Sequence, residues 1–204
     1  MTVQKELAGV SRETLEALES YLAETLKWTA KINLIAKSSH ANAWERHVLD
    51  SAQLWNHRPQ NAHRWLDLGS GAGFPALVNA IIAKTEAPDL SFACVESDIR
   101  KAVFLRKIVT QHRLNACVLD QRIEDLPTQD ADVISARALA PLPKLLTLAS
   151  AHATADATFL LLKGRRYRSE LTEARKIWQF DHSAVPSRTD PEAVILIVKG
   201  LKRA

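Results

Sequence analysis

The sequence predicts an α/β fold in which a mostly parallel sheet carries helices on both faces, behind a helical amino-terminal extension. Two observations support this prediction. From residue 63 onward, short apolar runs alternate with helical patterns, which is typical of a parallel sheet covered on both sides. Before residue 59 the apolar residues recur with helical periodicity only. We therefore expect an extension over residues 1–58 that packs on a core formed by residues 63–204.

The composition is that of a globular protein with a sizeable core. The chain has 204 residues, of which 47% are hydrophobic and 25% charged, and this balance excludes a largely disordered or collagen-like chain. No apolar run approaches the roughly 20 residues that span a bilayer, and the amino terminus lacks the apolar segment of a secretory signal. We therefore expect a cytoplasmic protein without a membrane partner. The net charge of +4 permits a nucleic-acid partner without requiring one.

The extension is expected to contain two helical segments. In the first, Ser11 is a suitable N-cap, and leucines recur at spacings of three and four residues, as on one buried helix face. These leucines are Leu15, Leu18, Leu22 and Leu26. The second segment is expected over residues 41–55. The polar run that follows contains Pro59, which ends the helical pattern.

The core is expected to contain six strands and four helices. The strands are predicted over residues 64–68, 90–96, 116–120, 132–135, 158–163 and 193–198. The helices are predicted over residues 75–84, 98–112, 142–153 and 167–178. In parallel sheets of this kind, ligands bind beyond the carboxyl ends of the strands. We therefore expect the chemistry in the loops that follow the strands.

A glycine-rich loop follows the first of these strands. The strand ends at Asp67, and Gly69, Gly71 and Gly73 follow at alternate positions before a helix begins. Glycines permit positive φ and let the backbone approach a ligand closely, and the helix behind them offers free N–H groups. The spacing differs from the G-x-G-x-x-G of dinucleotide sites. The acid before the loop would repel a pyrophosphate but suits the sulfonium and ammonium groups of S-adenosylmethionine (AdoMet), so we also place Ser70 at an AdoMet site.

Polar residues also follow the next two strands. Glu96 ends the second strand, where a carboxylate can accept hydrogen bonds from both ribose hydroxyls of the cofactor. The segment 120–125 follows the third strand and offers polar groups to the adenine edge. Within it, Arg122 is expected either to contact the cofactor or to form a surface ion pair.

These residues resemble the bacterial 16S rRNA guanine-N7 methyltransferases, also called glucose-inhibited division protein B. The resemblance spans roughly residues 28–164. The glycine loop is shared with most AdoMet-dependent methyltransferases, whereas the motifs upstream of it are far more specific. The matching motifs are Trp28-x-x-Lys31-x-Asn33-Leu34, Arg46-His47-x-x-Asp50-Ser51, Asp67-Leu-Gly-Ser-Gly-Ala-Gly-Phe-Pro75, Lys101-x-x-Phe104-Leu105-Arg106, Ser135-Ala-Arg137-Ala138 and Leu162-Lys163-Gly164.

The resemblance implies a Rossmann-like methyltransferase fold and a reaction. Methyl transfer from AdoMet would go to N7 of guanine 527, in the 530 loop of 16S rRNA of the small ribosomal subunit, and would leave S-adenosylhomocysteine. The chain departs from the family at Ala76, where glycine is common, and at Ala136, which precedes a matched arginine. The positions that the resemblance assigns to cofactor contacts are Gly69, Phe74, Ile123, Glu124 and Arg137.

Guanine N7 has an available lone pair, so its methylation needs no general base, and we assign no catalytic acid or base. Arg46, His47 and Asp50 can share one helix face, either as substrate contacts or as a network that ties the extension to the core. The candidates for substrate alignment are Arg46, His47, Asp50, Arg137 and Lys163.

A basic run follows the fifth predicted strand. It can bind RNA phosphates, or it can be the solvated start of a helix. No metal site is expected, because the histidines lack a third ligand at a suitable spacing. We expect a monomer, and two alternatives stay open: an AdoMet-dependent methyltransferase of a small molecule, and a non-catalytic ribosome assembly factor. The residues of the basic run are Lys163, Arg165, Arg166 and Arg168.

Overall fold

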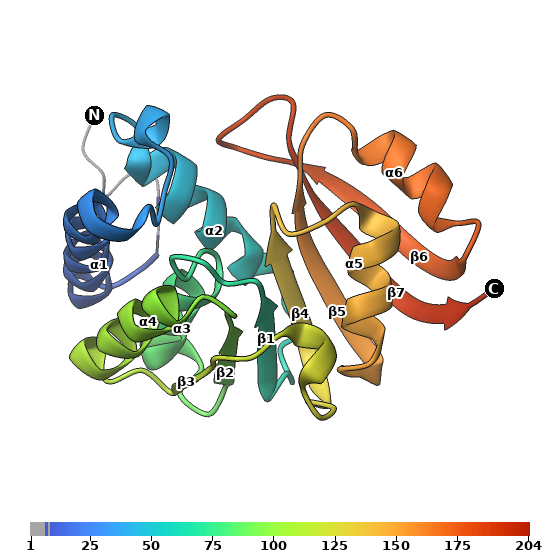
Figure 1. Cartoon of the computed structure of the whole chain (residues 1–204), viewed down its shortest axis with the longest axis horizontal. Coiled ribbons are helices and arrows are strands. Elements are labelled where there is room, and N and C mark those ends of the chain that lie inside the picture. The colour runs from blue at the N-terminus through green and yellow to red at the C-terminus, as the bar shows by residue number, and fades with distance from the viewer. Residues whose placement is uncertain (1–6, 8) are drawn as a thin grey trace.

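A computed structural model describes residue 7 and residues 9–204. A seven-stranded sheet runs through the molecule in the order β3-β2-β1-β4-β5-β7-β6 (Figure 1). The strands β1 to β5 pair in parallel, whereas β7 is antiparallel to both β5 and β6. The predicted mostly parallel sheet is therefore confirmed. The strands are β1 (Arg64–Leu68), β2 (Ser91–Val95), β3 (Ala116–Leu119), β4 (Ala131–Arg137), β5 (Ala153–Lys163), β6 (Trp178–Pro186) and β7 (Val194–Arg203).

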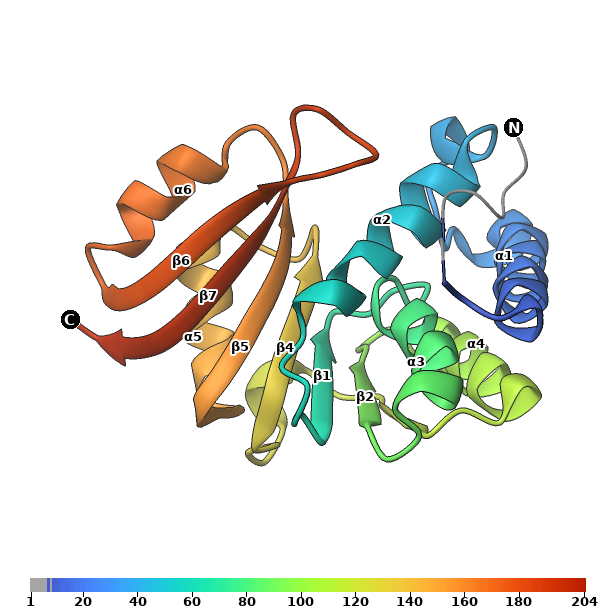
Figure 2. The ribbon, with the colours of Figure 1, turned by 180° about the vertical axis from the view of Figure 1, so that it is seen from behind.

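Helices cover both faces of this sheet. Figure 1 shows α5 in front of the strands, and Figure 2, from behind, shows α3 beside β2 and in front of α4. Successive residues of β1 point to opposite faces, so Trp65 packs in one apolar cluster with α1, α3 and α4, and Leu66 packs in a second cluster with α5 and α6. The long helices are α1 (Arg12–Ile32), α3 (Ala76–Glu86), α4 (Ile99–His112), α5 (Leu142–Ser150) and α6 (Tyr167–Ala174).

Helix α1 packs on α3 and α4 and also holds the glycine loop. The predicted N-cap is confirmed, because the Ser11 side chain accepts a hydrogen bond from the Thr14 N–H at 3.2 Å. The helix ends at Ile32 and is capped by Asn33, which has a φ of 48°. The buried Tyr21 hydroxyl donates to the Ala72 carbonyl at 2.6 Å. This bond fixes the extension to the loop in which we expect the cofactor.

The second helical segment, predicted over residues 41–55, is irregular. It consists of a π-helical turn η3 (Trp44–Leu49), one α-helical turn α2 (Asp50–Ala52) and a 3₁₀ turn η4 (Gln53–His57). Side chains bind its backbone carbonyls: the Ser51 hydroxyl donates to the His47 carbonyl, and the Asn79 amide donates to the Ser51 carbonyl at 3.1 Å. These side-chain hydrogen bonds compete with the regular backbone hydrogen bonds of an α-helix. Two further short turns are η2 (Lys37–Ser39) and η5 (Ile123–Asp125).

The carboxyl-terminal part also differs from the prediction. The strand β6 was not predicted, and the helix predicted to reach residue 178 ends at Ala174. The helix predicted to reach residue 153 ends at Ser150, where β5 soon begins. Strand β6 lies at the sheet edge and is mostly exposed, so its sequence lacks the alternation of a half-buried strand. The residues before it are good helix formers, which explains the overlong helix.

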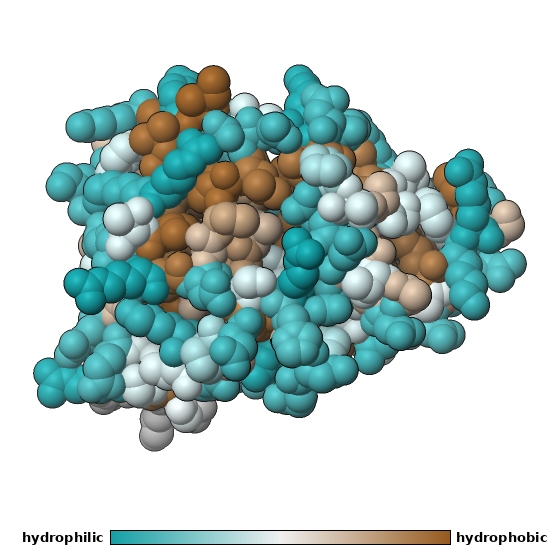
Figure 3. Space-filling view, turned by 90° about the horizontal axis from the view of Figure 1, so that it is seen from below, coloured by the Kyte–Doolittle hydropathy of each residue, from teal (hydrophilic) through white to brown (hydrophobic). Residues whose placement is uncertain are grey.

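The parallel strands end at the upper edge of the molecule in Figure 1. The opposite face, seen from below in Figure 3, shows a hydrophobic area bordered by hydrophilic residues. Among the described helices, none is long and apolar enough to cross a bilayer. The glycine loop and Glu96 follow β1 and β2 and therefore lie at the upper edge instead.

Candidate functional site

The glycine loop turns sharply between β1 and α3. Gly69, Gly71 and Gly73 all have positive φ, of 68°, 57° and 95°. A Cβ on Gly69 would lie 2.6 Å from the Leu139 side chain, and one on Gly73 would lie 2.6 Å from the Leu77 side chain. A Cβ on Gly71 would meet nothing nearer than a backbone oxygen at 3.9 Å. The loop is thus packed at both ends and open at Gly71, where a ligand can approach the backbone.

Glu96 lies beside this loop, at the end of β2. One carboxylate oxygen accepts from the Gly71 N–H at 2.8 Å, and the other accepts from the Asp98 N–H at 2.8 Å. The side chain is buried, so its position is fixed by two backbone donors. The predicted role of Glu96 toward the ribose stays a prediction, and the structure places its carboxylate next to the open glycine.

Asp67 has an unusual environment. Its Oδ1 accepts from the Ser135 hydroxyl at 2.6 Å, and the oxygen of Ser135 accepts from the Trp65 indole N–H at 2.8 Å. Its Oδ2 is buried and has no hydrogen-bond partner within the described part of the chain. Burial raises the pKa of Asp67 to about 6, although the bond from Ser135 acts in the opposite direction. Sequence reasoning missed the roles of Trp65 and Ser135 in this network.

These features fit the cationic end of AdoMet. A buried acceptor without a partner is costly unless a donor reaches it, and an ammonium group would supply both the donor and a compensating charge. The open space at Gly71 would admit the cofactor. We therefore expect Asp67, Gly71 and Glu96 to hold AdoMet, whereas the Ser70 hydroxyl is buried and donates to the Asp67 carbonyl at 3.1 Å.

The positions predicted after β3 separate into a buried and an exposed group. Ile123 is buried, and its carbonyl lies 3.1 Å from the His152 ring nitrogen. Arg122 and Glu124 are exposed. The described structure shows no ion pair of Arg122, so its predicted contact with the cofactor stays a prediction.

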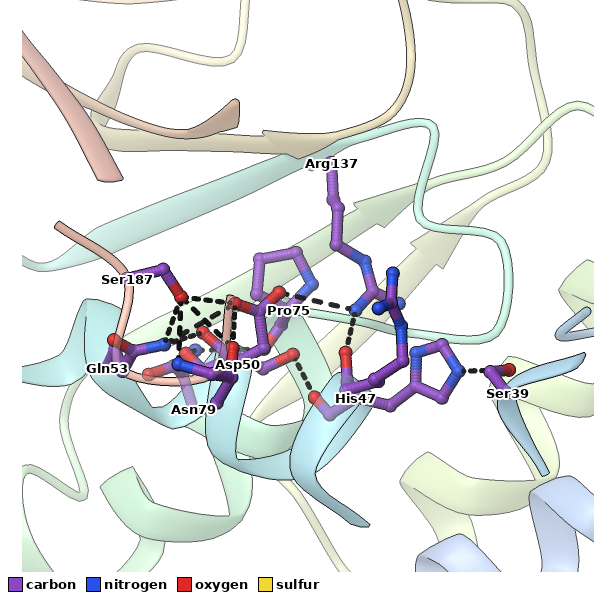
Figure 4. A network of polar contacts seen from close by, with 11 residues as sticks. Ser39, His47, Asp50, Gln53, Pro75, Asn79, Arg137 and Ser187 are labelled. Atoms are coloured by element: carbon purple, nitrogen blue, oxygen red, sulfur yellow. Dashed lines mark hydrogen bonds and ion pairs between the residues drawn. The ribbon is translucent and has the colours of Figure 1, made fainter. Parts of the chain in front are cut away.

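Arg137 extends from the end of β4 toward the extension (Figure 4). Its guanidinium donates to the Arg46 carbonyl at 3.0 Å and lies 3.7 Å from Asp50 Oδ2. It also lies 5.2 Å from the centre of the Phe74 ring, in a cation–π arrangement. Phe74 is buried. Arg137 therefore connects the extension, the glycine loop and β4.

His47 contacts Phe74 and Ser39, whereas Arg46 and Asp50 both border the cavity at the ends of β4 and β5. Its ring stacks on Phe74 at 5.1 Å, and its Nε2 lies 2.9 Å from the Ser39 hydroxyl. Burial lowers the pKa of His47 to about 4, and the charges of Arg137 and Arg46 lower it further. His47 is neutral at pH 7 and acts here as a packing group.

Asp50 fixes the segment that joins β6 and β7. Its Oδ1 accepts from the Ser187 hydroxyl at 3.3 Å and from the Thr189 hydroxyl at 2.9 Å. The neighbouring Gln53 accepts from the Arg188 N–H at 2.7 Å. Figure 4 shows Asp50, Gln53 and Ser187 converging on this contact. Sequence reasoning missed it, because no local pattern links residues so far apart in the chain.

A cavity of about 500 Å³ lies between the ends of β4 and β5 and the extension. Leu139, which packs against Gly69, is part of its wall, so the cavity adjoins the glycine loop. Within it, the Lys163 ammonium donates to the Ala140 carbonyl at 2.9 Å and to Glu170 Oε2 at 2.8 Å. The charged residues that line the cavity are Arg46, Asp50, Arg137, Lys163, Arg166, Glu170 and Asp190.

The residues of the predicted basic run lie in two different environments. Lys163 lies in the cavity with a side chain that is only 9% exposed, which favours a role in substrate alignment. Arg165, Arg166 and Arg168 are exposed, and Arg166 also borders the cavity. In the described residues, no group of three histidine, cysteine or acidic side chains is arranged to hold a metal ion.

Comparison with known proteins identifies relatives along nearly the whole chain. A family model described as GidB, rRNA small subunit methyltransferase G, matches residues 14–195. The ribosomal RNA small subunit methyltransferase G of Cereibacter sphaeroides is 50% identical over 192 residues, which cover 94% of this chain and 93% of that protein. Both the matched length and the identity are sufficient to establish the family.

Solved structures share the fold at much lower identity. M. jannaschii TYW2 in complex with AdoMet has a TM-score of 0.59 and 13% identity, over 86% of this chain and 80% of that chain. A 16S rRNA N2 methyltransferase of T. thermophilus, in complex with AdoMet and guanosine, has a TM-score of 0.54 and 15% identity, over 76% of this chain and 39% of that chain. These structures support the methyltransferase fold. The chain belongs to the rRNA small subunit methyltransferase G family of AdoMet-dependent enzymes.

Proposed function

We propose that this chain transfers a methyl group from AdoMet to N7 of a guanine in the 530 loop of 16S rRNA. The family supports the class of reaction. One observation carries the proposal: the loop with the unpartnered Asp67 Oδ2 adjoins the charged cavity through the contact between Gly69 and Leu139. A cofactor at the loop and a base in the cavity would therefore lie next to each other.

The residues at the site suit a reaction that needs alignment rather than proton transfer. When bound, AdoMet supplies the methyl group on a cationic sulfur. Guanine N7 carries a free lone pair, so no side chain has to remove a proton. Arg137 and Asp50 hold the wall between the extension and β4, and a fixed wall keeps the base in line with the methyl group. His47 packs on Phe74, and its lowered pKa of about 4 leaves it neutral at pH 7.

The direct test is transfer of labelled methyl from AdoMet to small ribosomal subunits that lack the modification, with naked 16S rRNA in parallel. We expect label at N7 of one guanine in the 530 loop. Label at another base would contradict the proposed target. AdoMet binding without any transfer would instead favour the small-molecule methyltransferase or the assembly factor.

Reversing the charge of Arg165 and Arg166 to glutamate is expected to weaken RNA binding and to leave AdoMet affinity unchanged. Both side chains are exposed, and each arginine that contacts a phosphate contributes about one unit to the slope of log affinity against log salt concentration. Binding titrations at several salt concentrations should show a slope lower by about two. The control is Arg175→Glu, after the other end of α6. If RNA affinity survives the double reversal, the RNA contact lies elsewhere.

Three further proposals concern the protein as a whole. We propose a division into an extension over residues 1–58 and a core over residues 63–204, supported by the bonds from Tyr21 and Asn79 that join them. We also propose that the chain acts in the cytoplasm, where ribosomal subunits assemble, and that it acts as a monomer. Light scattering of the purified chain tests the last proposal, and a dimer would contradict it.

A further inference from the structure

We infer that Glu170, held in place by Lys163, reads the Watson–Crick edge of the target base and selects guanine. This inference rests on the proposed function, because it assumes that the base enters the cavity beside the glycine loop. Glu170 lies in α6, and Lys163 ends β5. Both side chains line the cavity of about 500 Å³, a volume within the usual range for pockets that enclose small ligands.

The two side chains leave one donor and one acceptor unused. Glu170 Oε2 accepts from the Lys163 ammonium and from the Leu142 N–H, each at 2.8 Å. The other oxygen, Oε1, accepts no hydrogen bond from the described residues. An ammonium has three donors, and Lys163 uses two of them, toward Glu170 and the Ala140 carbonyl. The cavity therefore presents an N–H donor beside a carboxylate acceptor, and internal bonds hold both in fixed positions.

This pair is complementary to guanine. Guanine carries the acceptor O6 next to the donor N1–H, so Lys163 can donate to O6 while Glu170 Oε1 accepts from N1–H. Adenine carries the opposite pattern, an amino donor next to the acceptor N1, and would leave both protein groups unmatched. A site built to bond a polar group rejects an analogue that lacks it far more strongly than an apolar pocket does.

The orientation also suits the reaction. In guanine, N7 lies on the other side of O6 from N1–H, so a base held through O6 and N1–H keeps N7 free. The cavity wall also includes Arg137 and Leu139, and Leu139 contacts the glycine loop at Gly69. A base bound by Lys163 and Glu170 can therefore direct N7 toward the methyl group.

Glu170 also has a structural role, because its Oε2 binds the Leu142 N–H at the start of α5. The variant Glu170→Gln separates the two roles. The amide oxygen of glutamine can replace Oε2 and keep both internal bonds, and the amide N–H₂ then replaces Oε1. The cavity would present a donor where the natural chain presents an acceptor. The matched control is Glu173→Gln, on the same helix, where Glu173 is 57% exposed and pairs with Lys176.

The experiment uses small subunits whose 16S rRNA carries guanine, inosine or 2-aminopurine at the target position. Inosine keeps O6 and N1–H, whereas 2-aminopurine keeps N7 but lacks both groups. With the natural chain we expect similar kcat/KM for guanine and inosine, and a value about tenfold to hundredfold lower for 2-aminopurine. With Glu170→Gln, kcat/KM for guanine and inosine should fall about tenfold to hundredfold, and the preference over 2-aminopurine should shrink. AdoMet affinity and the Glu173→Gln control should be unchanged.

A merely structural role would lower kcat/KM for all three bases by the same factor. That result would overturn the inference, as would a natural chain that methylates 2-aminopurine as well as guanine. The second measurement needs no variant, so it holds even if Glu170→Gln fails to fold. If the natural chain labels no guanine at all, the proposed function is overturned. An active natural chain that fails to distinguish guanine from 2-aminopurine would overturn only the inference about Glu170.

Discussion

Replacing Gly71 by valine is expected to abolish AdoMet binding while the chain stays folded. Gly71 has a φ of 57°, and a Cβ there would meet no atom nearer than 3.9 Å. The Cβ of a valine would therefore have room in the free protein, and the side chain would fill the space through which the cofactor approaches the loop. A β-branched residue at positive φ is also strained, so some loss of stability is expected.

The control for this strain is Gly200→Val. Gly200 has a φ of 60°, its Cβ would lie 3.8 Å from Asp181, and it belongs to β7. The two variants carry a similar backbone penalty, of about 1 to 3 kcal/mol. Only Gly71→Val should lose AdoMet in a calorimetric titration, and both should melt cooperatively. Retained AdoMet affinity in Gly71→Val would show that the cofactor does not lie against this loop.

The sequence was informative about the parallel strands because each is a short apolar run that ends in a polar loop. Strand β1 has the predicted limits, and β2 and β3 differ from the prediction by one residue at each end or less. Strand β6 could not be predicted in the same way, because an exposed edge strand needs no apolar alternation. The irregular helical segment at residues 44–57 is held by a hydrogen bond from Asn79, a residue of α3.

The same contrast holds for the site. Asp67, the glycines and Glu96 stand next to strand ends, so their convergence follows from the order of the sheet. The wall of the cavity does not follow from any local pattern. Asp50 meets Ser187 across 137 positions of the chain. Lys163 was expected both in the basic run and as a candidate for substrate alignment, and it turns inward to pair with the partly buried Glu170.

Replacing Asp67 by asparagine is expected to stabilise the cofactor-free chain at pH 8. The side chain is 1% exposed, and burial raises its pKa from 3.8 to about 6. Because the folded-state pKa exceeds the unfolded-state value, the ionised carboxylate destabilises the fold above pH 6, and this penalty disappears below about pH 4. The penalty is up to about 3 kcal/mol. Asparagine carries no charge and can still accept the bond from Ser135.

The same variant is expected to lose AdoMet affinity. In the natural chain, ionised Asp67 offers Oδ2 to the cationic end of the cofactor, so removal of the charge should weaken binding by about thirtyfold or more at pH 8. The affinity of the natural chain should fall as pH drops through 6, to about one tenth at pH 5. The affinity of Asp67→Asn should be independent of pH over this range, because no carboxylate titrates.

Melting curves and calorimetric titrations between pH 5 and pH 8 check both parts of this prediction, with Asp156→Asn at an exposed position as the control. A variant that gains stability and binds AdoMet as well as the natural chain would show that Asp67 has only a structural role. A gain in stability together with a loss of affinity has one physical explanation. A buried carboxylate that the fold leaves half unsatisfied is destabilising in the free protein, and the positive charge of the cofactor relieves this destabilisation.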